Sequence, residues 1–157
     1  MTTLWRISNH ADLLGIGGLR APARWHNAGR PIVYLAEHPA LALLEILVHL
    51  EIRSGDDLPT IYRLLRIEVD DEASTARLDM SPAPVDWRAM TAWTRAAGSE
   101  WLSTGTSVLL EVPSVIVPFA RNYLMNPLHS DASHLHVAEV LDVQHDPRIL
   151  KLIRQEQ

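Results

Sequence analysis

Between Arg24 and Glu45 the chain reads RWHNAGRPIVYLAEHPALALLE. The run IVYLA within this stretch begins with β-branched and aromatic side chains, which suit a pleated surface, so we expect a strand over Arg30–Ala36. Proline is tolerated in the first turn of a helix, and Pro39 precedes a strongly apolar segment. The sequence therefore predicts a helix that begins near Pro39 and continues over Ala40–Leu50.

Three residues of this stretch are candidates for chemistry: Arg24 in the loop, Tyr34 on the strand and Glu45 in the helix. They offer a cation, an aromatic hydroxyl and a carboxylate, a set that suits an anionic ligand carrying a cationic ring. A guanidinium can fork onto phosphate oxygens or pair with a carboxylate. Each residue also has a structural interpretation, because loop arginines are often exposed and strand tyrosines often belong to the core.

Glu45 has two interpretations that helical spacing leaves open. Spacing places it on one stripe with His38, His49 and Arg53, which favours a solvated polar face on an amphipathic helix. The alternative is a carboxylate in an apolar cleft, whose charge must be matched by a ligand or an arginine.

The rest of the chain predicts a mixed α+β domain. Strands and helices alternate too irregularly for a doubly wound sheet, so we expect a mixed, mainly antiparallel sheet with flanking helices. The polar cluster Ser54–Asp57 ends the helix that carries Glu45. The expected strands are Leu4–Ser8, Arg30–Ala36, Thr60–Val69, Ser107–Val112, Val115–Val117 and His134–Leu141, and Asn122–Pro127 is expected to be a turn segment.

A second helical region follows the prolines at 82 and 84. Asp86 can cap a helix that runs towards Ala97, and Gly98 is expected to separate it from a second short helix. The tryptophans of this region lie at helical spacing, which is typical of core packing rather than of a cofactor site.

Composition narrows the class of protein. A chain of 157 residues without cysteine predicts one domain, residues 1–157, with no disulfide framework and no thiolate metal site, compatible with a reducing cytosol. The sequence shows no signal peptide and no apolar run long enough to span a membrane. Fourteen basic against nineteen acidic residues give a net charge of −5 with scattered basic residues, so nucleic acid is not an expected partner.

Other polar residues give weaker signals. Ser114 lies between two apolar runs without the Gly-x-Ser-x-Gly context of a nucleophile, so it is expected to be a turn residue or an orienting hydroxyl. The chain has eight histidines but no His-Glu-x-x-His set, so no metal is expected. The glycines at 15, 17 and 18 lack the spacing of a dinucleotide fingerprint.

Several segments together resemble the RES-domain family, toxins of bacterial RES–Xre toxin–antitoxin pairs named for arginine, glutamate and serine. Their order and spacing over nearly the whole chain make the match more specific than any one segment. The segments are Trp5-Arg6, Arg24-Trp25, Asn27-x-Gly29, Val33-Tyr34, Ala42-Leu43-Leu44-Glu45, Val112-Pro113-Ser114 and Asn122-Tyr123-x-x-Asn126-Pro127-x-His129. This chain has Pro22-Ala23 where the family often has glycines, and His26 interrupts its usual Trp-Asn.

The resemblance implies an ADP-ribosyltransferase-like fold, a cytoplasmic activity that consumes NAD+ as substrate without a cofactor, and a cognate antitoxin with an Xre-type helix-turn-helix that occludes the active site. A homodimeric toxin core is compatible with it. The family residues map onto catalytic Arg24, Tyr34, Glu45 and Ser114, with Arg6 and Asn126 joining Arg24 and Tyr34 in substrate binding.

On this hypothesis Glu45 stabilises an oxocarbenium-like ribose as the nicotinamide bond breaks, by analogy with glycoside hydrolysis. Arg24 and Arg6 grip the pyrophosphate, Tyr34 packs on the nicotinamide, and Ser114 positions the nicotinamide or the carboxylate. The reaction would be that of an NAD+ glycohydrolase or phosphorylase. An ADP-ribosyltransferase with a macromolecular target and a non-catalytic protein-binding module are the alternatives.

Overall fold

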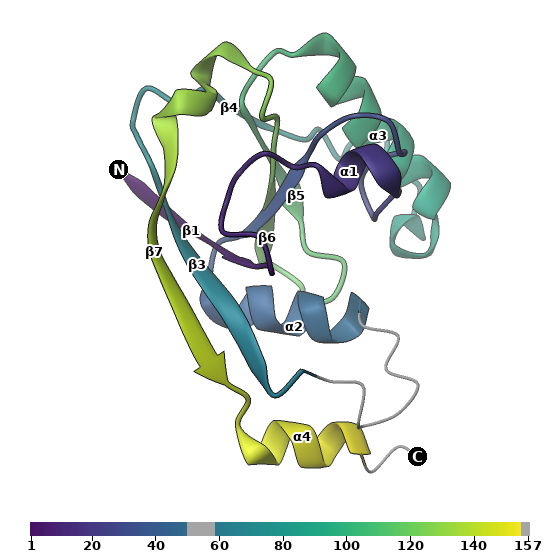
Figure 1. The fold of residues 1–157 in the computed structure, drawn as a ribbon. Helices are drawn as coiled ribbons and strands as arrows, with labels where there is room; N and C mark the ends of the chain where they lie inside the picture. Colours follow the sequence, from purple (N-terminus) through teal and green to yellow (C-terminus); the bar gives the residue numbers. More distant parts are fainter. Residues whose placement is uncertain (50–58, 155–157) are drawn as a thin grey trace.

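The computed structural model describes residues 1–49 and 59–154, and Leu50, Arg53 and the Ser54–Asp57 cluster lie outside them. Among the described helices, none combines the length and the apolar composition that a membrane span requires. In chain order the elements, drawn in Figure 1, are β1 (Thr2–Ile7), α1 (Gly17–Arg20), β2 (Val33–Ala36), α2 (Pro39–His49), β3 (Ile61–Val69), β4 (Thr75–Arg77), the 3-10 helix η1 (Trp87–Ala89), α3 (Thr91–Thr104), β5 (Leu109–Pro113), β6 (Arg121–Met125), the 3-10 helix η2 (Ser130–His134), β7 (Leu135–Gln144) and α4 (Pro147–Arg154).

The described strands form one seven-stranded sheet in the order β4-β5-β6-β2-β1-β3-β7. Only β4 and β5 pair in parallel, and every other neighbouring pair is antiparallel. The prediction of a mixed, mainly antiparallel α+β domain is therefore confirmed. The strands predicted over Leu4–Ser8 and Thr60–Val69 correspond to β1 and β3, and the one predicted over His134–Leu141 continues further, to Gln144.

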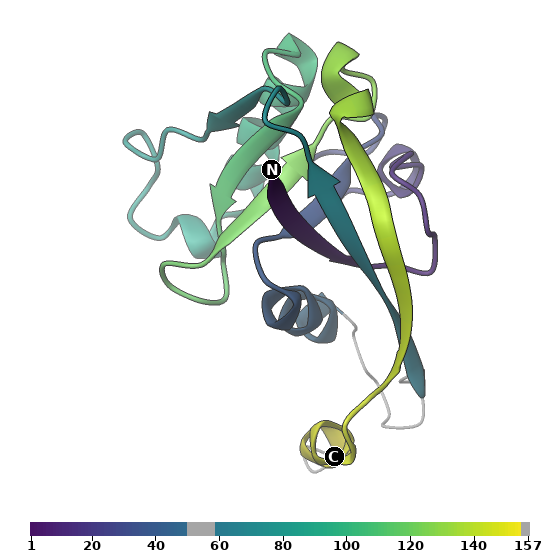
Figure 2. The same ribbon diagram turned by 90° about the vertical axis from the view of Figure 1, so that its left-hand side faces the viewer.

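Strand β3 shows how the sequence pattern sets the sheet. Its side chains at Leu65, Ile67 and Val69 are buried, as the alternation of apolar and polar residues requires. The strand pairs with β1 on one side and with β7 on the other. Figure 2 shows β3 and β7 continuing together as a long ribbon towards α4.

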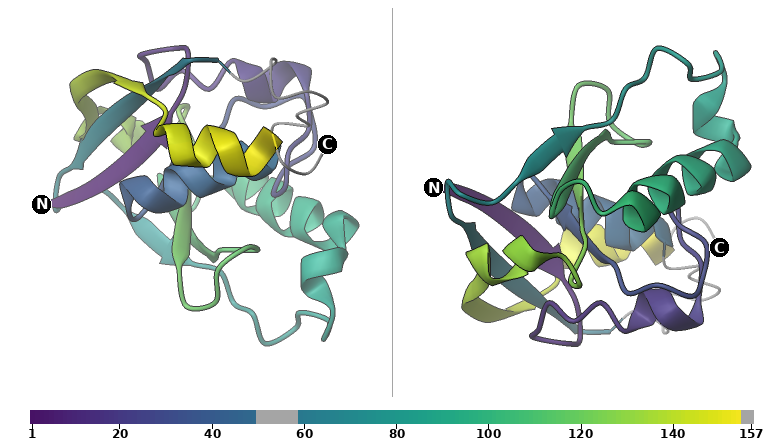
Figure 3. Two further views of the ribbon diagram at one scale, coloured as in Figure 1. Left: turned by 90° about the horizontal axis from the view of Figure 1, so that it is seen from below. Right: turned by 90° about the horizontal axis from the view of Figure 1, so that it is seen from above.

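The helices cover different parts of the sheet. Helix α2 packs through Leu41 and Ala42 against Ala36 of β2, and α3 packs through Trp101 and Leu102 on a separate core with β5 and β6. Helix α4 lies at the far end of the β3–β7 ribbon (Figure 1), and in the view from below it passes in front of part of α2 (Figure 3). The predicted helix from Pro39 is confirmed as far as His49.

Helix α3 differs from the prediction at both ends and in the middle. Asp86 gives no side-chain cap and precedes only the 3-10 turn η1. Residues 91–104 then form one helix, so the predicted break at Gly98 is wrong. Gly98 has a packing role instead, because a Cβ built there would lie 1.8 Å from the carbonyl oxygen of Trp25. The glycine lets the helix backbone touch the loop that carries Arg24.

Substituting Gly98 with alanine is expected to destabilise the protein by about 1–3 kcal/mol, because the added methyl group must push α3 away from the carbonyl of Trp25. Urea denaturation measures this loss. Gly17→Ala is the matched control, since a Cβ at Gly17 meets nothing within 4 Å, and its stability should stay within about 0.5 kcal/mol of the parent. Equal stability of both variants would contradict the packing role.

The segment from Ser114 to Met125 also departs from the prediction. The expected turn over Asn122–Pro127 is largely strand β6, which pairs with both β2 and β5, so its neighbours override the weak strand preference of asparagine. The expected strand over Val115–Val117 is a series of bends. The side chain of Ser114 accepts hydrogen bonds from the N–H groups of Ile116 and Val117, and thus takes the place of a strand partner.

Candidate functional site

A cavity of about 340 Å³ opens between β1, the segment that follows α1, β2 and α2. This volume lies at the lower end of the range of small-molecule sites. Two arginines and one carboxylate line it, which gives a formal charge of 2 − 1 = +1 in a chain whose net charge is −5. The cavity therefore favours an anionic ligand. Residues that line it include Trp5, Arg6, Arg24, Tyr34, Glu45 and Asn122.

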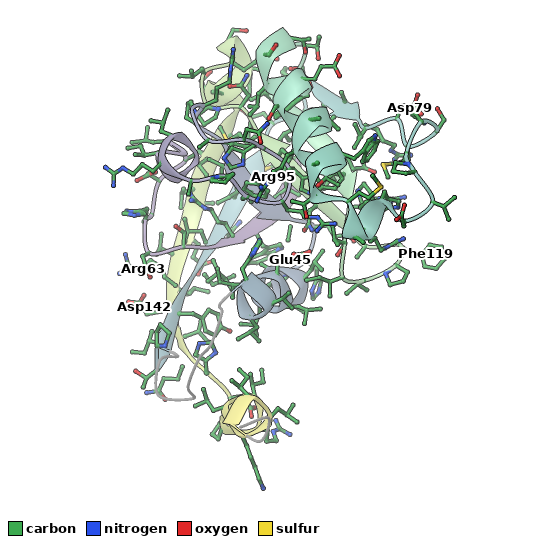
Figure 4. The ribbon with its side chains drawn as sticks, turned by 90° about the vertical axis from the view of Figure 1, so that its right-hand side faces the viewer. Glu45, Arg63, Asp79, Arg95, Phe119 and Asp142 are labelled. Carbon is green, nitrogen blue, oxygen red and sulfur yellow. The ribbon has the colours of Figure 1, made fainter. Side chains whose placement is uncertain are left out.

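Glu45 lies on the wall that α2 contributes, so the cleft interpretation describes it better than the solvated stripe. Figure 4 shows it on the side of α2 that faces the body of the domain. Its Oε1 accepts hydrogen bonds from Ser114 Oγ at 3.1 Å and from Asn122 Nδ2 at 2.7 Å. Within residues 1–49 and 59–154 its Oε2 accepts none. One oxygen holds the carboxylate in place, and the other is available to a ligand.

Ser114 donates a hydrogen bond that fixes the carboxylate of Glu45. Its side chain is buried, with 1% of its surface exposed. The hydroxyl accepts the N–H groups of Ile116 and Val117, each at 3.1 Å, and donates to Glu45. Ser114 does not line the cavity, and its hydroxyl fits both predicted interpretations, because it satisfies the backbone of the turn and also orients the carboxylate of Glu45.

Asn122 is a site residue that the sequence pattern does not single out. It lies on β6 opposite Ala36 of β2 and Val112 of β5, and Ser114 follows the end of β5 two residues after Val112. This register brings its amide to the carboxylate of Glu45. The sequence predicts a turn here, and its signal for Asn122 is the first position of the Asn-Tyr-x-x-Asn-Pro-x-His segment that resembles the family.

Arg24 lies in a tight turn in which the N–H of Ala23 donates to the carbonyl of His26 at 3.1 Å. Its guanidinium donates to the carbonyl of Arg88 and, at 3.4 Å, to the hydroxyl of Thr91. The Nε atom is buried and has no partner in the described part of the chain. Burial lowers the pKa of Arg24, nearby Glu45 opposes this shift, and Arg95 adds to it. An arginine stays charged through such shifts, so the turn delivers a fixed cation to the cavity.

Arg6 delivers the second cation from β1. One of its terminal nitrogens donates to the carbonyl of Asp12 at 2.6 Å, which orients the side chain along the cavity wall. Burial lowers its pKa, and the carboxylate of Asp12 opposes the shift. A partly desolvated guanidinium gains more from an anionic ligand than an exposed one does.

Tyr34 contributes its aromatic ring to the cavity, because its hydroxyl is engaged elsewhere. The hydroxyl is already engaged, since it accepts the N–H of Trp25 at 3.1 Å and lies 2.7 Å from Nδ1 of His26. Burial raises the pKa of Tyr34, so the phenol stays neutral. The residue lines the cavity, which makes an aromatic wall its contribution to ligand binding.

The remaining predicted residues lie elsewhere. Asn126 is buried, but its side chain accepts the N–H of Leu128 at 3.1 Å and it does not line the cavity. Among the histidines, His134 lies with Asp70 and Glu72 such that their ligand atoms are within 4.8 Å of one another. None of these three lines the cavity.

The seven-stranded mixed sheet and the glutamate held in a cationic cavity define the class as an α+β domain with a site for a small anionic ligand. The family model described as the RES domain matches residues 3–148. The chain belongs to the RES-domain family of toxins, as the sequence predicted.

Individual relatives agree with this assignment. Toxin Res of Pseudomonas putida is 48% identical over 147 residues, which cover 93% of this chain and 98% of that protein. The Prs ADP-ribosylating toxin of a Sphingobium species is 38% identical over 160 residues, with 96% and 98% covered. The crystal structure of the M. tuberculosis MbcT–MbcA toxin–antitoxin complex matches with a TM-score of 0.75 at 19% identity, with 98% of this chain and 89% of that chain covered. The last comparison shows a shared fold.

Proposed function

We propose that this protein is the toxin of a toxin–antitoxin pair and that it depletes cytoplasmic NAD+ by cleaving the bond between nicotinamide and ribose. The observation that carries the proposal is the carboxylate of Glu45, which Ser114 and Asn122 hold by one oxygen in a cavity with two arginines. NAD+ carries an anionic pyrophosphate and a cationic nicotinamide ring. The two arginines can pair with the pyrophosphate, and the ring of Tyr34 can pack against the nicotinamide.

The proposed chemistry needs little acid catalysis, because the nicotinamide of NAD+ is already a cationic leaving group. As the C–N bond breaks, its electron pair leaves with nicotinamide and the ribose becomes positively charged. The Oε2 atom of Glu45 stabilises this charge at close range, and the stabilisation is largest in a site that excludes water. Water or phosphate then attacks the ribose, and Glu45 helps to orient the hydroxyl groups of the ribose.

The other residues bind the substrate. Arg24 and Arg6, which both line the cavity, pair with the pyrophosphate through their guanidinium groups. The ring of Tyr34 packs against nicotinamide, whose positive charge an aromatic face attracts. The site needs no cofactor on this proposal, because the substrate carries the leaving group.

A cognate antitoxin is part of the proposal. The similar M. tuberculosis fold was solved as a toxin–antitoxin complex, and the resemblance in sequence implies an Xre-type helix-turn-helix partner that covers the cavity. A homodimeric toxin core belongs to the same proposal. The neighbouring reading frame should encode a small helix-turn-helix protein.

ADP-ribosyl transfer to a macromolecule is the second candidate, because one relative with 38% identity is named an ADP-ribosylating toxin. Both reactions break the same bond and need the same carboxylate. They differ only in the acceptor, which is water or phosphate in one case and a target residue in the other.

One experiment separates the candidates. Purified protein, free of antitoxin, is incubated with NAD+, and nicotinamide release is followed together with the fate of ADP-ribose. A glycohydrolase yields free ADP-ribose, a phosphorylase yields its phosphorylated form, and a transferase leaves ADP-ribose on protein or nucleic acid supplied from a lysate. Folded protein that releases no nicotinamide under any of these conditions would overturn both enzymatic proposals and favour a non-catalytic binding module.

A further inference from the structure

His26, which departs from the usual sequence of the family, lies at the centre of the Arg24 turn. Only 1% of its surface is exposed. Its Nδ1 lies 2.7 Å from the hydroxyl of Tyr34, and its Nε2 lies 3.3 Å from the carbonyl oxygen of Gly18. The imidazole therefore joins the turn, strand β2 and helix α1.

The partners fix the protonation of the ring. A carbonyl oxygen can only accept, so Nε2 carries the hydrogen and donates to Gly18. In a neutral imidazole Nδ1 is then the acceptor, and it takes the hydrogen of the Tyr34 hydroxyl. The hydroxyl oxygen in turn accepts the N–H of Trp25. The hydrogen bonds run in one direction, from Trp25 through Tyr34 and His26 to Gly18.

We infer that His26 is a positioning residue, whose neutral imidazole fixes the Tyr34 ring at the cavity wall and couples it to the turn that presents Arg24. The inference rests on the proposed function, in which the ring packs against nicotinamide. A hydroxyl held from two sides has one orientation, so the ring is placed before the substrate arrives. His26 itself contributes no atom to the reaction.

Protonation of His26 breaks this arrangement. A hydrogen on Nδ1 would point at the hydroxyl oxygen of Tyr34. The hydrogen of that hydroxyl would then have no acceptor among the described residues. Burial lowers the pKa of His26, hydrogen bonds to the backbone of Gly18 and Ala21 oppose this shift, and Arg95 adds to it. The change is therefore expected below the ordinary histidine value of about 6.5. Tyr34 on β2 contacts the ring directly, and Arg95 on α3 is its charged neighbour. The other titratable or charged groups of the same cavity are Arg24 in the same turn, Arg6 on β1, and Glu45 and His49 on α2.

Two substitutions separate the roles of the two ring nitrogens. His26→Asn places an amide oxygen near the Nδ1 position, so it keeps the acceptor for Tyr34 and does not titrate. His26→Gln places its amide near the Nε2 position. This variant keeps the hydrogen bond to Gly18 and loses the acceptor for the hydroxyl of Tyr34. With NAD+ as substrate, His26→Gln is expected to lower kcat/KM by about 10- to 100-fold, and His26→Asn is expected to stay within about threefold of the parent.

The pH profile provides the specific readout. The parent is expected to lose nicotinamide release on acidification as His26 becomes protonated, whereas His26→Asn should retain its rate through the same range. His49→Gln is the control for the other histidine of the cavity, and it should keep the acidic loss. An acidic loss that persists in His26→Asn, or full activity of His26→Gln, would overturn the inference.

A second measurement does not depend on activity. Nitrogen NMR of the histidine rings should show hydrogen on Nε2 and not on Nδ1 of His26 at neutral pH, and Tyr34→Phe should shift the Nδ1 resonance. Hydrogen on Nδ1 would overturn the inference even in an active enzyme. Protein that shows the expected ring state but releases no nicotinamide would instead remove the proposed function and leave the hydrogen-bond chain intact.

Discussion

Substitution of Glu45 with glutamine is expected to reduce nicotinamide release by roughly 1000-fold while the fold stays intact. The amide oxygen of glutamine can still accept the hydrogen bonds of Ser114 and Asn122 that Oε1 accepts in the parent. The side chain therefore keeps its position and loses only its charge. A neutral amide cannot stabilise a developing oxocarbenium ion, so the loss falls on kcat rather than on KM.

Measurement of this loss needs a control for charge alone. Glu37→Gln removes the same formal charge from an exposed residue outside the cavity and keeps the acceptor for the N–H of Arg121. Its turnover should match the parent within about threefold. Both variants should unfold at the same urea concentration as the parent. Equal turnover of Glu45→Gln and the parent would remove Glu45 from the mechanism.

Local sequence patterns predicted the parts of this fold that depend on local rules. The alternation in β3 and the apolar run after Pro39 each specify an element whose buried face follows from its own residues. The same rules could not decide how Glu45 is used, because a polar residue on a helix is solvated or enclosed according to what packs above it. Ser114, which follows β5, and Asn122 on β6 supply that environment from 69 and 77 residues further along the chain.

Residues with a long-range role were misread for the same reason. Gly98 resembles a helix break in the local sequence, but its role is to make room for a carbonyl 73 residues earlier in the chain (98 − 25). His26 interrupts a familiar motif, yet its ring is satisfied on both sides by groups that only the folded turn brings together. Resemblance identified Arg24 and Glu45, and the register of β6 was needed to add Asn122.

Replacement of Ser114 with alanine is expected to weaken both stability and activity, because one hydroxyl serves three partners. Its loss leaves the N–H groups of Ile116 and Val117 without their acceptor, at a cost of about 1–3 kcal/mol in the free energy of unfolding. It also removes one of the two donors that hold Glu45, and a looser carboxylate should lower the rate of nicotinamide release by roughly 10- to 100-fold.

Asn122→Ala is the matched variant that separates these two effects. It removes the other donor to Glu45 and none of the acceptors that serve the backbone, so its rate should fall by a similar 10- to 100-fold, roughly, while its unfolding free energy falls by about 1 kcal/mol. Urea denaturation and nicotinamide release, measured well below the melting temperature, give both quantities.

If Ser114→Ala loses activity without any loss of stability, the hydroxyl does not hold the turn, and its role must lie in the cavity itself. If the double variant Ser114→Ala/Asn122→Ala loses no more activity than either single variant, the two donors to Oε1 act on Glu45 as a unit.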